Sequence, residues 1–526
     1  MLATTEGYSG FWSDPQLMLW SGVFRMSQAV IAAAPFLLTG MLVTGVLRGM
    51  IGEATVRRLF GVGHWSGPIR GWFLGILLPL CSLGALPVAR ELRRAGVPSA
   101  TVLSFVLVAP VLNPISILYG ISHITLITLL YFLIGTMIVS LGIGFIWDNL
   151  VSKRLDVVSE TPESLPSSAF KRVAITGVSS TRGVLSSLPD VAMAVLAVGL
   201  LGAFLPYGTL QASLTRDNAL ATVIMGGVAI PAYVTPFEVM VQYGLIVRDG
   251  YSLGAGFALI VLGAGANVGV ANWIRREYRY KALAVFLLLL LGTTLFLGLT
   301  ADRVVYYGKV AVGHTHAFDS YTRLSSIYPD PTYVAWYLNA IGEKLTVPQA
   351  VGISTLGLML FGAIALRLLG DRASISNLMK QSEREEPVTG SVLQRPVSMG
   401  VVIAVGSLGL MSTIGIAIFI IHPPKDQLIG EANVVSYALY DAVRDNDHDE
   451  INRRIQEWDM RVRKVPIAMF IRGEQLPEEA LEAIQDVIHL LESLRRYNEH
   501  GESEKAATLY RFLEQRYYAC RQLVKT

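Results

Sequence analysis

The chain has 526 residues, of which 52% are hydrophobic and 16% charged, and its mean hydropathy is +0.49. A soluble globular protein carries about 25% charged residues, so this composition excludes a disordered chain and a collagen-like fibre and argues against a water-soluble enzyme. Two cysteines, Cys81 and Cys520, are too few for a disulfide scaffold, and a net charge of +3 is too small to indicate a nucleic-acid partner.

Charge is concentrated in the last fifth of the chain. Residues 425–526 contain 15 Lys/Arg and 19 Asp/Glu, whereas residues 1–424 contain 28 and 21. The sequence therefore predicts an all-α protein with a membrane body and a small soluble helical tail. The first twenty residues contain no basic residue, so they lack the n-region of a signal peptide.

Long runs without charge predict about eight full membrane crossings, because a spanning helix needs about 20 apolar residues. The run at 97–147 is long enough for two helices with a turn near residues 120–123. The complete set of runs is 26–47, 97–147, 191–215, 250–274, 282–301, 345–366 and 396–424.

Two further apolar stretches contain Gly/Pro breaks. Residues 71–89 include Pro79 and Pro87, and residues 218–237 include Pro231 and Pro236. Proline removes a backbone donor, and in hydrocarbon a broken backbone is tolerated only where it is buried in protein or lines a wet cavity. A kinked helix fits each stretch, and so does a re-entrant hairpin at a substrate site.

The amino-acid sequences that follow the two breaks are similar to each other. Gly96 and Asn113 are 17 positions apart, and so are Gly250 and Asn267, with small residues at matching places between them. If both breaks re-enter, one face of the membrane collects 21 Lys/Arg and the other 7, the asymmetry that the positive-inside rule favours. This arrangement predicts two inverted repeats, with the N-terminus and the tail outside.

The interruptions supply candidate substrate-binding residues. Cys81 is a soft ligand for metals or metalloids as a thiolate, or a small buried apolar residue. Asn113 and Asn267 are amides inside apolar runs, where each needs a partner or a substrate. The full predicted set is Pro79, Cys81, Ser82, Asn113, Pro114, Pro231, Pro236 and Asn267.

Two ionisable sites are also candidates. Glu238 directly follows the second break, where it would relay protons at membrane depth or be solvated. His314, His316 and Asp319 lie in the loop 302–344 and form a candidate site for a divalent ion. No Walker loop, dinucleotide glycine signature or nucleophile elbow occurs, so we expect no hydrolysis of nucleotide by the chain itself. We also expect no cofactor.

These signals divide the chain into six parts. Residues 1–147 form the first membrane repeat, 148–187 a linker, 188–301 the second repeat and 302–344 an extramembrane loop. Residues 345–424 hold two extra crossings with a charged linker, and 425–526 form the tail, with expected helices near 478–497 and at 503–525. The tail is a candidate docking surface for a partner protein.

The segment "LLPLCSLGALPVARELRRAGVPSATVLSFVLVAPVLNPISI" resembles the signature of the predicted-permease family that includes the organoarsenical permeases. The resemblance covers about residues 21–300 and implies an inner-membrane permease, some members of which export trivalent organoarsenicals. The matching positions are Pro79, Cys81, Ser82, Gly84, Pro87, Gly96, Pro98, Pro110, Asn113 and Pro114. The family often has a second cysteine where Leu83 stands here.

The resulting hypothesis is a permease, not an enzyme, that moves a small solute by alternating access and is coupled to a proton or ion gradient. The solute would be a metalloid or an organoarsenical-like compound. Its partners would be the lipid bilayer and the solute. The rival hypotheses are a membrane scaffold or sensor that acts through the tail, and an intramembrane metalloenzyme that uses the histidine loop.

Overall fold

The computed structural model describes residues 15–152, 165–166, 168–305, 315–324, 341–342, 345–368, 411, 415 and 422–525. In these residues the elements are helices, and one isolated β-bridge joins Thr215 to Tyr251, which confirms the predicted all-α class. The chain divides into two compact units, Met1–Leu410 and Met411–Thr526.

Five helices in the described part of the chain are long and apolar enough to cross a membrane. They are Pro15–Ile51, Ile127–Val151, Ala169–Phe204, Val268–Val304 and Val347–Leu368. The expected crossing at 396–424 lies almost wholly outside the described residues, as does the charged linker before it. The total of eight crossings therefore stays a prediction.

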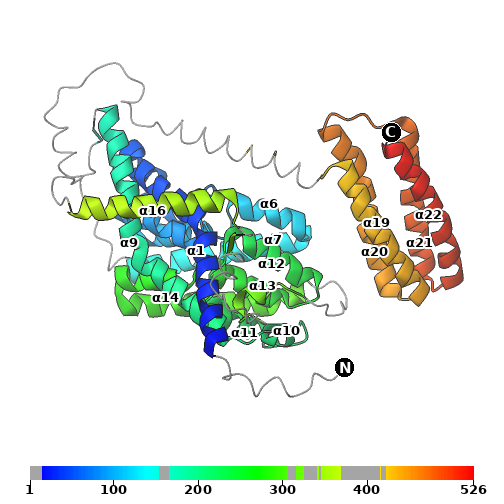
Figure 1. Cartoon of the computed structure of the whole chain (residues 1–526), viewed down its shortest axis with the longest axis horizontal. Helices are drawn as coiled ribbons and strands as arrows, with labels where there is room; N and C mark the ends of the chain where they lie inside the picture. Colours follow the sequence, from blue (N-terminus) through cyan, green and yellow to red (C-terminus); the bar gives the residue numbers. More distant parts are fainter. Residues whose placement is uncertain are drawn as a thin grey trace. The chain divides into compact units, whose positions relative to one another are not determined.

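The first half of the membrane body runs from α1 to α7 (Figure 1). Its elements are α1 (Pro15–Val46), the π-turn η2 (Leu47–Ile51), α2 (Glu53–Leu59), α3 (Gly67–Ile76), α4 (Ser82–Arg94), α5 (Ser99–Val108), α6 (Pro114–His123), α7 (Leu126–Trp147) and η3 (Asp148–Ser152).

The second half repeats this order and is followed by a loop and one further helix. Its elements are α9 (Ala169–Phe204), α10 (Thr209–Ser213), α11 (Ala221–Ala229), α12 (Pro236–Arg248), α13 (Leu253–Ala258), the π-turn η4 (Leu259–Gly265) and α14 (Val268–Val304), then η5 (Asp319–Tyr321) and α16 (Val347–Leu368). A kink at Arg279 divides α14 into two helical pieces.

The two halves correspond residue by residue at an offset of 154. Helix α4 starts at Ser82 and α12 at Pro236, and both have 13 residues, so the offset is 236 minus 82, or 154. The long helices α1 and α9 have the same offset at their first residues, 15 and 169, and at their internal prolines, Pro35 and Pro189. The predicted duplication therefore extends through all the membrane helices of each half.

The equivalent helices α1 and α9 pack against each other in opposite directions (Figure 1). Near the start of α1, Gly22 faces the carbonyl of Gly199 near the end of α9. Near the end of α1, Gly45 faces the carbonyl of Thr176 near the start of α9. Small residues let the two backbones approach closely. This antiparallel pairing of equivalent helices relates the halves by an inversion, as the repeat hypothesis predicts.

Both predicted interruptions in the apolar stretches are present, and each forms the tip of a hairpin. In the first hairpin, α3 leads to a tip at 77–81 and α4 leads back from it. Arg57 Nε, in the helix α2 that precedes α3, donates to the carbonyl of Ala95, just after α4, at 2.8 Å. The two arms therefore begin and end at the same end of the helix bundle. Helices α11 and α12 form the equivalent hairpin, with its tip at 230–235.

Two of the runs that we expected to be continuous crossings are interrupted. The first breaks at 109–113 between α5 and α6, and the second at 266–267 between η4 and α14. Pro114 has no N–H, and the two interruptions end at Asn113 and Asn267, which cap the following helices. Helix α9 also starts at Ala169, so residues 169–187, which we expected to be linker, belong to a long helix.

The second unit is a bundle of four helices that pack in sequence and close by contact between the first and the last. These helices are α19 (Lys425–Asp445), α20 (His448–Ile471), α21 (Glu478–Glu499) and α22 (Ser503–Lys525), so the two helices expected in the tail are present. Trp458 and Tyr510 are buried in its core, and the Tyr510 hydroxyl donates to the Ser436 carbonyl at 2.8 Å. The solubility of this unit remains a prediction.

The buried thiol of Cys520 provides a native reporter of the bundle. Burial raises its pKa from 9.0 to about 11, and thiolate is the form that reacts with maleimide. We expect native Cys520 to react about 100-fold more slowly at pH 8 than an ordinary thiol, since two pKa units reduce the thiolate fraction by that factor. Trp458→Ala should restore fast labelling by removing about 3–5 kcal/mol of core packing. Peptide mass spectrometry would measure both rates, and fast labelling of the native chain would contradict the expectation.

Candidate substrate site

Four helices begin at the interruptions, and each has a side-chain cap. The backbone N–H of Gly84 donates to Cys81 Sγ at 3.2 Å, and that of Ser116 donates to Asn113 Oδ1 at 3.0 Å. In the second half, Thr235 and Asn267 cap α12 and α14 in the same way. A helix start in an apolar interior needs such acceptors, because no bulk water satisfies its first N–H groups.

Asn113 forms hydrogen bonds to both interruptions of the first half. Its Nδ2 donates to the carbonyl of Leu80 at 3.2 Å and to that of Ala109 at 3.0 Å. Leu80 lies in the hairpin tip, and Ala109 lies in the break between α5 and α6. The amide is fully buried, and its partners explain why the residue is an asparagine.

Asn267 joins the second half to the first. Its Nδ2 donates to Ser82 Oγ at 2.8 Å, so the start of α14 contacts the start of α4. The equivalent contact brings α6 to α12, where Ser116 Oγ donates to the carbonyl of Pro236 at 3.4 Å. The structure therefore brings the predicted residues of both halves together at one buried position.

The remaining predicted residues lie at the same interruptions. The Cys81 thiol is fully buried and lies beside Tyr233 of the opposite hairpin tip. Pro114 occupies the first turn of α6, as Pro236 does in α12, where a missing N–H costs nothing. Pro79 and Pro231 lie in or beside the tips and are half-buried.

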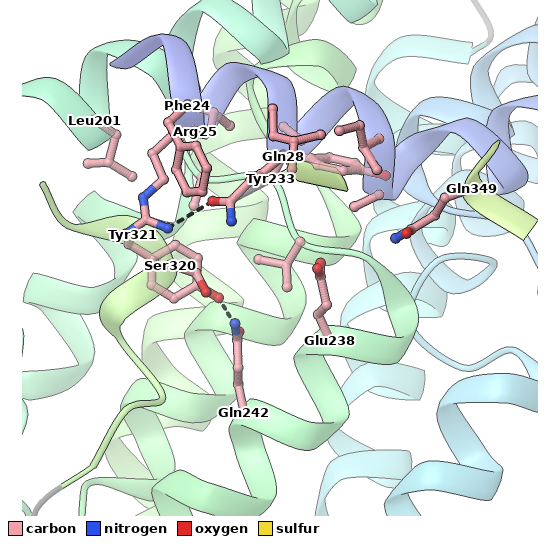
Figure 2. Close-up of a pocket in the computed structure, with 17 residues that line it drawn as sticks. Phe24, Arg25, Gln28, Leu201, Tyr233, Glu238, Gln242, Ser320, Tyr321 and Gln349 are labelled. Carbon is pink, nitrogen blue, oxygen red and sulfur yellow. Dashed lines mark hydrogen bonds between the residues drawn. The ribbon is translucent and has the colours of Figure 1, made fainter. Parts of the chain in front are cut away.

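A cavity of about 220 Å³ lies beside the second hairpin tip, and we call it the Glu238 cavity (Figure 2). The start of α1, the tip of the second hairpin and the loop around Tyr321 line it. Its residues are Phe24, Arg25, Gln28, Ala29, Ile31, Ala32, Val198, Leu201, Ala232, Tyr233, Val234, Glu238, Gln242, Ser320, Tyr321, Ile341 and Gln349. Cys81, Ser82, Asn113 and Asn267 are not among them.

Polar side chains close the Glu238 cavity on the loop side. Arg25 Nε donates to the carbonyl of Thr322 at 3.1 Å, and its Nη1 donates to Gln28 Oε1 at 2.8 Å (Figure 2). The Tyr321 hydroxyl donates to Gln242 Oε1 of α12. A guanidinium on a membrane helix needs such acceptors, and these contacts hold the loop over the cavity.

Glu238 has a structural role as well as a place in the cavity wall. Its Oε2 accepts from Thr235 N at 3.2 Å and from Thr235 Oγ1 at 2.9 Å, which forms a capping box at the start of α12. The carboxyl is positioned by these bonds and faces the cavity (Figure 2). The cap alone accounts for a glutamate at this position, so a proton-relay role needs a functional test.

The predicted metal site is only partly within the described residues. His316 Nδ1 lies 2.8 Å from Asp319 Oδ2, and Gln211 Nε2 donates to Asp319 Oδ1 at 3.0 Å. His314 lies outside the described residues. Elsewhere in the described chain no three His, Cys, Asp or Glu side chains form a group that suits a metal.

The sequence analysis did not single out Tyr233, Gln242 or Arg25. Arg25 was visible as the lone charge at the start of an apolar run, and Gln242 as a polar residue after the second break. Their common cavity depends on the packing of α1 against the second hairpin, so no signal within either segment reveals it.

Comparison with known proteins places the chain in a family. The model of the ArsP-like predicted-permease family matches residues 23–302, which is just over half of the sequence. The match spans both hairpins, the four capped interruptions, α9 and the part of α1 from residue 23 onward. The chain belongs to this family. Together with its apolar helices, this membership identifies the chain as a multi-pass protein of the plasma membrane.

Two curated relatives share parts of the chain. The UPF0718 protein YcgR of Bacillus subtilis is 33% identical over 86 residues, which are 16% of this chain and 29% of YcgR. A putative two-component membrane permease complex subunit of Streptococcus mutans is 26% identical over 135 residues, or 25% of this chain and 45% of that protein. The chain thus spans less than half the length of either relative. No solved structure matches it.

Proposed function

We propose that this chain moves a small solute across the inner membrane by alternating access around the four capped interruptions. The contact between Asn267 and Ser82 is the observation that carries the proposal. It joins two broken helices from inverted halves at a fully buried position. Paired discontinuous helices from inverted repeats are the usual place of a transporter's substrate site.

The direction of the helices supports this function. Helices α4, α6, α12 and α14 all start at the buried interruptions, so their N-terminal N–H groups lie there. The solute would bind between the hairpin tips, with Cys81, Ser82, Asn113 and Asn267 around it and the four prolines shaping the backbone. The Glu238 cavity would be one approach to this position, since Tyr233 lines the cavity and lies beside Cys81.

Flux in reconstituted vesicles tests the proposal. We expect Asn113→Ala and Asn267→Ala to reduce flux at least tenfold, because each removes a helix cap and a bond between segments. Cys81→Ser tests the metalloid class separately, with a trivalent organoarsenical and a non-thiophilic solute compared in one preparation. Gly142→Ala is a matched control, since nothing lies within 4 Å of its added Cβ. Flux that survives all three site substitutions would disprove the site.

Glu238 is the proposed coupling residue for a proton gradient. Glu238→Gln keeps the shape of the capping box but cannot lose a proton at physiological pH. We expect this variant to exchange solute across the membrane while losing accumulation driven by a pH gradient. Thr235→Ala disturbs the cap and keeps the carboxyl, so it should leave gradient coupling in place. Unchanged accumulation in Glu238→Gln would remove Glu238 from the coupling step.

The tail bundle is the basis of a second proposal, a partner subunit. The Streptococcus mutans relative is named as a subunit of a two-component complex. The bundle is a compact unit of its own, which suits a docking role. If deletion of 422–526 abolishes function while no gradient-driven flux of any solute is found, a scaffold or sensor role would replace transport.

A further inference from the structure

A second cavity, of about 410 Å³, lies between the end of α1, the end of α4 and the first half of α9. We call it the arginine cavity. Its lining consists of Thr44, Arg48, Pro87, Arg90, Glu91, Arg94, Ser179, Arg182, Gly183 and Ser186. Four guanidinium groups and one carboxylate thus line it, which gives the lining an excess of positive charge.

The arginine cavity is the counterpart of the Glu238 cavity in the inverted repeat. At the offset of 154, Arg25, Gln28, Ala29 and Ala32 of one cavity correspond to Ser179, Arg182, Gly183 and Ser186 of the other. The two cavities lie against α12 and α4, the return arms of the two hairpins. Because α1 and α9 are antiparallel, the two cavities lie toward opposite ends of this helix pair, the Glu238 cavity beside the start of α1 and the arginine cavity beside its end.

Ion pairs fix two of the four arginines on the α4 side. Arg90 pairs with the buried carboxylate of Asp190 and donates to Ser187 Oγ at 2.9 Å. Arg94 pairs with Glu53 at 3.0 Å and with Glu91 at 2.7 Å. These bonds hold the guanidinium groups in place beside the cavity, and such preorganised donors suit an oxyanion.

A buried hydroxyl adds a neutral donor. Ser179 is 5% exposed and lines the cavity, and its Oγ has no hydrogen-bond partner within the described part of the chain. A serine in a helix can bond to the carbonyl four residues earlier, so a buried hydroxyl that does not do so is available to a ligand. Arg48 and Arg182 flank the same cavity from α1–η2 and α9.

We propose that the arginine cavity binds an oxyanion through these guanidinium groups and the Ser179 hydroxyl, and that the transported solute carries such a group. The proposal rests on the proposed permease function and adds the chemical class of the solute. The group would be a phosphate, sulfate or carboxylate, and a phospholipid headgroup presents the same chemistry. The alternative is that these arginines only set the orientation of the chain in the membrane, by the positive-inside rule, and this alternative predicts no selective binding.

Equilibrium binding to the full chain tests the site. Radiolabelled sulfate and phosphate would be titrated against protein in nanodiscs of zwitterionic lipid, with glycerol as a neutral control. Arg48→Gln/Arg182→Gln leaves the ion pairs of Arg90 with Asp190 and of Arg94 with Glu53 and Glu91 in place, and we expect it to weaken binding at least tenfold. Ser179→Ala should weaken it several-fold without removing charge. The matched control Arg58→Gln/Arg367→Gln removes two exposed arginines outside the cavity and should bind like wild type.

A second experiment distinguishes the two sources of the oxyanion, a free anion and a phospholipid headgroup. Native mass spectrometry in anionic nanodiscs would detect a retained phosphatidylglycerol, and its loss in the Arg48/Arg182 variant would assign the site to a headgroup. No oxyanion or lipid bound by folded wild type, or equal loss in the control variant, would overturn the site. Oxyanion binding without flux would sustain the site and refute transport. Flux of neutral solutes alone would sustain the permease and refute the oxyanion class.

Discussion

Replacement of Asp190 by alanine should strongly destabilise the membrane body, because it removes a buried carboxylate that bonds to two other helices. Asp190 is fully buried on α9, directly after Pro189, and it accepts from Arg90 of α4. It also accepts from Asn272 Nδ2 at 2.7 Å and pairs with Arg276 at 3.2 Å, both on α14. One carboxylate on α9 thus connects this helix to α4 of the first half and to α14 of the second half.

The expected loss for Asp190→Ala is about 3 kcal/mol of unfolding free energy. Breaking a buried ion pair costs about 3–5 kcal/mol because a charge is left without its partner, and the partial exposure of Arg90 argues for the lower end. Unfolding of the detergent-solubilised full chain by a denaturing detergent would measure it. The double variant Arg90→Ala/Asp190→Ala should recover part of the loss, since no orphan charge from that pair remains.

Glu277→Gln is the matched control for Asp190→Ala. Glu277 is an exposed carboxylate on the same helix as Arg276, so its loss should change the stability by less than about 0.5 kcal/mol. Equal effects of the two substitutions would show that general charge balance, and not the buried bridge, stabilises this part of the bundle.

The interruptions could be predicted from the sequence where proline and glycine mark them inside an apolar run. The breaks at 77–81 and 230–235 were found this way. The break before Asn113 carried the same signal in Pro114, but the run was long enough to accommodate an unbroken helix. The break before Asn267 has no proline, and its position follows from the cap and from equivalence with Asn113.

Other features depend on tertiary contacts that local patterns do not encode. The contact of Ser82 with Asn267 joins residues 185 positions apart, so neither segment alone predicts it. The start of α9 was interpreted as linker because it carries serines, threonines and basic residues. Its packing against Gly45 of α1 and Gly49 of η2 stabilises it as a helix despite that composition.

Gly40→Ala should disrupt the permease through a single methyl group. Gly40 lies where α1 crosses the start of α4, and an added Cβ would lie 2.0 Å from the carbonyl oxygen of Gly84. The obstacle is backbone, so no rotamer change relieves it and the two helices must separate. Such overpacking costs about 1–3 kcal/mol, and separation would also move Cys81 and Ser82 away from Asn267. We expect flux to fall at least tenfold in vesicles that contain equal amounts of folded protein.

Gly142→Ala is the control that distinguishes an effect on the contact between α1 and α4 from a general effect of glycine replacement. Gly142 lies in α7 with open space around it, so alanine there should leave flux unchanged and raise stability by up to about 1 kcal/mol through helix propensity. Gly84→Ala should reproduce the defect of Gly40→Ala from the other side, because its Cβ would lie 2.5 Å from the carbonyl oxygen of Phe36. Full flux in both crossing variants would show that α1 and α4 need not be in close contact, and that the hairpin tip is positioned by other means.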